Sequence, residues 1–307
     1  MGYPGRKSLG VRIRSVELSA DDAYQYERLG GSLLSEALFE YDQFVSVDHR
    51  RVDLSRWKQW KHDDDVVVYR ERHGSESLTD DMSGQTRSRL TAFSTTHRVT
   101  HSAYEGASRT RDSKQPTPRL LAVGSLSTTL DDVLYGIVTP TAAAMRLKAS
   151  YLGNEDFLDG AVIAQIRPPS PSEPFQFVGI KWVLQRGMLG SSLGLVRPRD
   201  FVFLESTGVQ IRQDGSGLRV GYHIMHSVDL PECPGLVDGK GPVQRGAFST
   251  CYLYHELANG HGQLALPLTL CRKQEARVDA TDAPPAQCGD GISGCVRRRD
   301  QVAVWTV

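Results

Sequence analysis

Two short runs of the sequence carry residue types that act as nucleophiles or metal ligands in enzymes. The run from Gly190 to Gly194 (GSSLG) matches G-x-S-x-G, the turn that exposes a nucleophilic serine between a strand and a helix. The residues after it read as a strand, so the helix that a nucleophilic Ser192 requires is missing and an inter-strand loop is favoured. His255-Glu256 begins like the zinc motif H-E-x-x-H, but Asn259 stands where the second histidine is needed. A zinc protease is therefore excluded, and a hydrolase using Ser192 is the weakest of three functional hypotheses.

Other candidate motifs also lack the context that their chemistry needs. Three consecutive carboxylates, Asp63 to Asp65, cannot converge on one ion and are typical of a solvated turn. The G-x-G-x-x-G formed by Gly289, Gly291 and Gly294 follows no strand, so a dinucleotide site is not indicated. The cysteines are widely spaced, with no C-x-x-C pair, which argues against both a disulfide framework and a zinc finger. We therefore predict no catalytic residues, no metal and no cofactor.

The composition is that of a soluble globular chain. Its 307 residues contain 36 Lys and Arg and 36 Asp and Glu, so the net charge is zero and no basic field is available to hold a nucleic-acid backbone. The chain shows no apolar run long enough to span a membrane and no apolar region of a secretory signal. We expect a cytoplasmic protein that does not bind nucleic acid.

The first half of the chain combines helices with a long polar stretch. Ser19 is a suitable N-cap for an amphipathic helix over about residues 20–41. The β-branched run Val66 to Tyr69 predicts a short strand. Residues 73–118 are poor in large apolar side chains and predict a mostly disordered insertion. A strand from Leu120 and a helix over 141–151 are expected to follow.

The second half is predicted to be rich in antiparallel strands. The run from Phe175 to Leu184 alternates, with its apolar side chains on one face and Lys181 on the other, which we expect to face solvent. The turn sequence Asp214-Gly215-Ser216-Gly217 predicts a hairpin into a strand over 218–228, and a further strand is expected over 246–257. Arg199 and Asp200 begin a strand on opposite faces, and we expect structural pairing roles for them.

An apolar sheet face in which a few side chains end in a polar group can either enclose an apolar ligand or form a filled core. From the residues alone both readings stay open. The candidates for lining a ligand cavity are Val178, Ile180, Trp182, Leu184, Tyr222, Ile224 and His226.

Several segments, in order, resemble the START domains, the lipid-transfer modules related to the steroidogenic acute regulatory protein. The pattern is most similar to the divergent START-like proteins of oomycetes and covers about residues 16–257. The resembling segments are Arg197 to Leu204 (RPRDFVFL), Trp57-Lys58 with Val66 to Arg72, Val123 to Gly136, Gly221 to Val228, and Gln244 to Leu253.

The resemblance implies an α+β helix-grip fold, in which a curved antiparallel sheet and a long C-terminal helix enclose one lipid or sterol. The expected organisation is an N-terminal tail over 1–15, a START-like domain over 16–262 with the insertion 73–118, and an irregular tail over 263–307. The chain departs from the family after Leu257, where no long amphipathic helix is predicted, so the closing helix is expected to be poorly formed. The paired cysteines of the FYVE zinc finger that some relatives carry are also missing.

The leading hypothesis is a nonenzymatic START-like protein that binds or transfers an apolar, lipid or sterol-like ligand and contacts membrane surfaces transiently. The alternative is a protein-interaction module on the same fold with a filled or open cavity.

Overall fold

The computed structural model describes residues 13–63, 65–72, 119–186, 198–212, 215–238, 241–256, 263–266 and 271–274. Its helices are α1 (Ala20–Ser46), α2 (Leu130–Ile137) and α3 (Ala142–Tyr151). Its longer strands are β1 (Trp57–Asp63), β2 (Val66–Glu71), β3 (Arg119–Ser127), β4 (Phe157–Arg167), β5 (Phe177–Gln185), β6 (Arg199–Ile211), β7 (Arg219–Ser227) and β11 (Ala247–Glu256). The shorter strands are β8 (Val237–Asp238), β9 (Gly241–Pro242), β10 (Gln244–Arg245), β12 (Gln263–Leu266) and β13 (Cys271–Gln274). The predicted insertion lies outside the described residues.

Helix α1 is the long amphipathic helix that the sequence predicts. The Ser19 hydroxyl accepts a hydrogen bond from the backbone N–H of Asp22 at 3.1 Å, which satisfies one of the free donors of the first turn. Its buried side chains recur at helical spacing from Tyr26 to Phe44. Because Phe44 continues this buried face, the helix runs to Ser46, beyond the predicted end.

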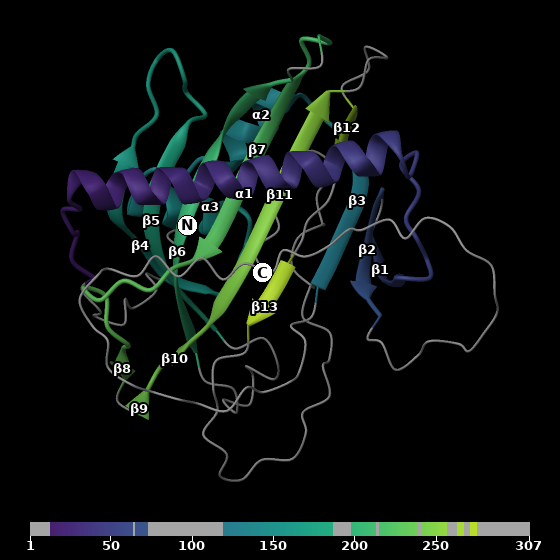
Figure 1. Cartoon of the computed structure of the whole chain (residues 1–307). Coiled ribbons are helices and arrows are strands. Elements are labelled where there is room, and N and C mark those ends of the chain that lie inside the picture. Colours follow the sequence, from purple (N-terminus) through teal and green to yellow (C-terminus); the bar gives the residue numbers. More distant parts are fainter. Residues whose placement is uncertain are drawn as a thin grey trace, which may run out of the picture.

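A large, open antiparallel sheet forms the centre of the structure (Figure 1). Its strand order is β1-β2-β3-β12-β11-β7-β6-β5-β4, with β13 beside β11 and β3, and β10 parallel to β6. The hairpin between β6 and β7 is confirmed, and its turn contains Gly215 and Gly217, both at positive φ, which explains the glycines of this turn. Three register shifts between β4 and β5 bend this edge of the sheet.

The helices cover both faces of the sheet. On β7, Val220 and Ile224 pack against Ala37 and Tyr41 of α1. The alternating residue Met225 packs instead in a cluster with α2 and α3. Successive side chains of a strand point to opposite faces, so α1 lies on one face and α2 with α3 on the other (Figure 1). We call these the α1 face and the α2/α3 face.

Because helices cover both faces of the sheet, the predicted solvent exposure of Lys181 on β5 is not observed. Lys181 was expected in solvent, but only 1% of its surface is exposed. Its neighbours on the same face, Phe177 and Val183, are also buried. The prediction is wrong because alternation shows which residues share a face, and a sheet covered on both sides has no solvent face in its central strands.

Asp200 has the structural pairing role that was expected. Its fully buried carboxylate accepts hydrogen bonds from Trp182 Nε1 at 3.0 Å and from Arg245 Nε and Nη2 at 2.9 and 2.8 Å. Arg245 also donates to the backbone oxygen of Cys233. Through Arg245, Asp200 thereby holds the connection between β7 and β11 against the sheet.

The end of the described chain differs from the irregular tail that the sequence predicts. Strands β12 and β13 pair with β11 and β3, so for these two segments the prediction is wrong. The free edges of β3 and β11 offer backbone hydrogen bonds to these two segments. The hydrogen bonds stabilise a strand even where the local sequence has only a weak preference for one. Between and after them, residues 257–262, 267–270 and 275–307 lie outside the described part of the chain, and so does any closing helix there.

Candidate functional site

A group of polar side chains lies in the middle of the α2/α3 face. The strand register sets Phe177, Thr207, His223 and Tyr252 in one row across four strands, with Gly179, Glu205, Met225 and Thr250 in the next. Lys181 lies two residues beyond Gly179 on β5, and so on the same face. Polar residues from four adjacent strands are thus brought together within an apolar surface.

Lys181, Glu205, His223 and Thr139 form a buried hydrogen-bonded group, here called the charged cluster. Lys181 Nζ forms an ion pair with Glu205 Oε2 and donates to Thr139 Oγ1 at 2.9 Å. His223 Nε2 lies 3.0 Å from Glu205 Oε1. Thr139 belongs to the link between α2 and α3, so the cluster ties these helices to the sheet.

Burial and mutual contact set the protonation of the cluster. Burial alone would raise the pKa of Glu205, but the Lys181 ammonium and the hydrogen bond from His223 outweigh it and lower that pKa to about 2. Burial lowers the pKa of Lys181 and that of His223, and Glu205 opposes both shifts. A protonated His223 would leave the cluster with an uncompensated positive charge in an apolar interior, so His223 is neutral.

Two buried polar atoms on this face have no hydrogen-bond partner among the described residues. They are Nδ1 of His223 and Oγ1 of Thr250, in residues that are 2% and 1% exposed. Buried polar atoms are nearly always paired with protein, water or a ligand. These two atoms therefore mark a place where the face offers unused hydrogen-bonding capacity.

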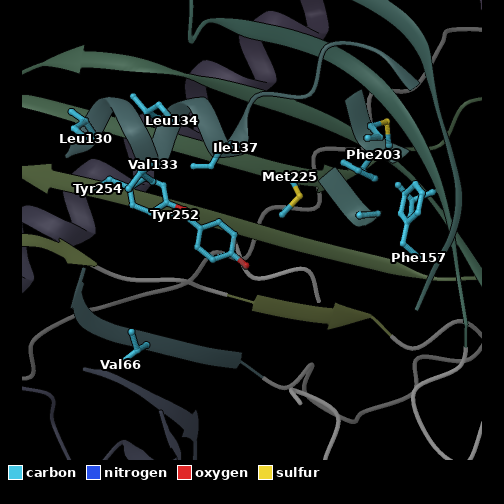
Figure 2. Close-up of a cluster of buried hydrophobic side chains, with 13 residues drawn as sticks. Val66, Leu130, Val133, Leu134, Ile137, Phe157, Phe203, Met225, Tyr252 and Tyr254 are labelled. Carbon is cyan, nitrogen blue, oxygen red and sulfur yellow. The ribbon is translucent and has the colours of Figure 1, made fainter. Parts of the chain in front are cut away.

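Apolar side chains surround the charged cluster. Leu130, Val133, Leu134 and Ile137 of α2 belong to the same buried group as Met225, Phe203 and Tyr252 (Figure 2). Further along the same face, several apolar residues are only half-buried: Ala122, Leu126, Val162, Phe201 and Phe248. The face thus combines a large apolar area with a few polar groups, the usual composition of a small-molecule binding site.

The seven cavity residues predicted from the sequence lie on the opposite, α1 face. Val178, Ile180, Trp182 and Leu184 pack with Tyr26 and Leu29 of α1, while Tyr222 and Ile224 pack with Ala37 and Tyr41. His226 shares that face, and its Nδ1 lies 2.8 Å from the Ser249 hydroxyl. Their contact with a ligand stays a prediction.

Sequence reasoning missed the charged cluster, although a signal for it exists. Lys181 is the one charged residue in the run FVGIKWVL, and Glu205 follows the apolar run FVFL in the next strand. A single basic and a single acidic residue in adjacent apolar strands indicate a buried pair.

Within the part of the chain that the structure describes, the weaker motifs add no second site. Ser192 lies outside the described residues. Within the described ranges, no group of three or more His, Cys, Asp or Glu side chains is placed to hold a metal ion. In those ranges no helix combines the length and apolar character that crossing a membrane requires.

Comparisons with known proteins give matches among solved structures. No protein-family model matches the chain, and no curated protein does. Similar solved structures do exist. Human STARD10 aligns with 87% of this chain and 72% of its own at 11% identity and a TM-score of 0.41. Human StAR-related lipid transfer protein 5 aligns with 83% of each chain at 16% identity and a TM-score of 0.44. A STAR-related lipid transfer protein fragment from Xanthomonas axonopodis aligns with 73% of this chain and 85% of its own at 10% identity and a TM-score of 0.38.

Proposed function

We propose that this chain is a nonenzymatic binding or transfer protein for one apolar, lipid or sterol-like molecule, held on the α2/α3 face. The observation that carries the proposal is the charged cluster within a broad apolar sheet face that short helices cover only in part. Burial of an apolar ligand contributes about 25 cal/mol per Å² of surface, and a few polar groups orient its head. The sequence resemblance to START domains points to the same class of ligand.

The chemistry of the cluster favours binding over catalysis. Lys181 and Glu205 neutralise each other, and burial surrounds both with protein, so neither is placed as a nucleophile or a general base for a substrate. The half-buried residues Phe201 and Phe248 form an aromatic group with the buried Phe203, with ring centroids 5.4 Å apart for Phe201 and Phe248 and 5.3 Å for Phe203 and Phe248. Such rings contribute apolar contact area without reactive groups.

Native mass spectrometry after incubation with a lipid extract tests the proposal. We expect one lipid of defined mass per chain. A chain that stays empty with every extract would overturn the proposal and favour the protein-interaction module instead.

A pair of matched variants tests the choice of face. Val162 is half-buried on the α2/α3 face and Val228 is half-buried against the α1-face cluster. We expect Val162→Trp to fill space on the proposed ligand face and reduce lipid occupancy, while Val228→Trp leaves occupancy near that of the wild type. The reverse result would place the ligand on the α1 face, with the seven residues predicted from the sequence.

A further inference from the structure

His223 presents a hydrogen-bond acceptor whose direction is fixed by Glu205. The Glu205 carboxylate only accepts hydrogen bonds, so the imidazole nitrogen at 3.0 Å from it, Nε2, carries the proton. In a neutral imidazole the other nitrogen then has a free lone pair. Nδ1 of His223 is therefore an acceptor, and it is the atom without a partner among the described residues.

Thr250 offers a second unused group close to the first. Tyr252 is the cross-strand partner of His223, and Thr250 is the partner of Met225, so Thr250 and His223 occupy diagonal positions on neighbouring strands. Same-face diagonal neighbours lie about 7–8 Å apart between backbones, within reach of one small bridging group. The Thr250 hydroxyl carries a proton that it can donate.

We propose that His223 and Thr250 together recognise a hydroxyl group at the polar end of the bound molecule, which rests on the function proposed above. The hydroxyl donates its proton to His223 Nδ1 and accepts the proton of the Thr250 hydroxyl. Both orphaned atoms are satisfied at once, and Glu205 acts as a positioning residue by holding the tautomer.

Other head groups fit these two atoms less well. A ketone, ester or ether oxygen has no proton, so it leaves His223 Nδ1 unpaired. A carboxylate or phosphodiester also lacks a proton for Nδ1 at neutral pH. An ammonium group, or any other charged head group, would be buried without a counter-charge, because Lys181 and Glu205 already neutralise each other. The site therefore selects a neutral donor.

Met225 provides the adaptability that admission of a ligand requires. It lies opposite Thr250 and two residues from His223 on the same face, and Figure 2 shows it among the side chains of the α2/α3 face near Tyr252. A methionine side chain has three rotatable bonds and repacks readily around a new neighbour. A hydroxyl group can thus reach the two atoms through a change of side-chain rotamer.

The test compares ligands that differ only in the donor. Binding of 3β-cholestanol is measured against 3-cholestanone, and of hexadecanol against its methyl ether, by native mass spectrometry and by competition. In whichever of the two pairs binds, we expect the wild type to bind the alcohol about tenfold more tightly or better than its analogue, because the analogue leaves a buried group unpaired. Thr250→Val and His223→Phe should reduce this preference to about twofold or less while the analogue still binds.

Thr207→Val is the matched control. Thr207 lies on the same face, but its hydroxyl already donates to the backbone oxygen of Phe175 at 2.8 Å. This variant should lower the melting temperature and keep the preference for alcohols. Thr250→Val loses an unpaired hydroxyl, so its melting temperature should stay unchanged or rise.

The outcomes separate this inference from the proposed function. Equal binding of alcohol and analogue by the wild type would overturn the hydroxyl recognition alone and leave the two atoms as sites for buried water. Failure of all four probes and of lipid extracts to bind would overturn the proposed function, and with it this inference.

Discussion

Replacing Lys181 by methionine should destabilise the protein strongly. Methionine has a similar length but no charge, so Glu205 would remain buried without its main counter-charge, and Thr139 would lose its donor. Removing one member of a buried ion pair costs about 3–5 kcal/mol. Glu205 keeps its hydrogen bond to His223, so we expect a loss of free energy of unfolding near the lower end, about 3 kcal/mol.

The double variant Lys181→Met/Glu205→Leu should be less destabilised than the two single changes predict together. It removes both charges and leaves only neutral groups of the cluster without their partners, His223 Nε2 and the Thr139 hydroxyl, at a cost of about 1–3 kcal/mol for each. A double-mutant cycle should therefore show a coupling of about 2 kcal/mol or more between the two residues.

Urea denaturation at pH 7, followed by circular dichroism, measures these differences. Lys58→Met on β1 is the matched control, because Lys58 is exposed and its loss should change stability by no more than about 0.5 kcal/mol. If Lys181→Met also stayed within that margin, the Lys181 side chain would reach solvent, and the charged cluster would not be buried.

Three further predictions concern pH, backbone packing and the α1 face. Because its pKa lies at about 2 instead of the usual 4.5, Glu205 contributes stability above pH 4.5 that is lost as the pH falls toward 2, and melting curves of Glu205→Gln should lack this contribution. Gly221→Ala should cost about 1–3 kcal/mol in urea denaturation, because the new methyl group would lie 2.7 Å from Leu130 Cδ1, whereas Gly31→Ala on the open side of α1 should stabilise by about 0.5–1 kcal/mol. The reverse order for the two glycines would contradict the placement of α2. Trp182→Ala should cost about 3–5 kcal/mol because the indole is 1% exposed, and a loss typical of a surface residue would refute its burial.

Local signals were sufficient to predict individual elements. The cap at Ser19 with its helical repeat predicted α1, and the turn after Arg212 predicted the β6–β7 hairpin. Both depend on interactions between residues close in sequence, which the order of residue types reveals directly.

The site could not be predicted in the same way, because it depends on register between strands. Alternation in β5 separated Trp182 from Lys181 correctly, but it could not show that α2 and α3 cover the second face. The meeting of Lys181 with Glu205 and His223 follows from the pairing of β5, β6 and β7, which no single segment encodes. The predicted cavity residues were therefore grouped correctly on one face, while the buried polar group lies on the other.

The position of β12 and β13 has a consequence for the order of folding. These strands lie between β3 and β11, so the edge formed by β1, β2 and β3 joins the rest of the sheet through segments that follow β11 in the chain. The meander from β4 to β7 needs only short-range closure, whereas this junction must wait until the chain has returned across the whole domain. The β4–β7 meander should therefore be the early folding unit and the most slowly exchanging part of the native protein, with β1 to β3 the last to join and the first to open.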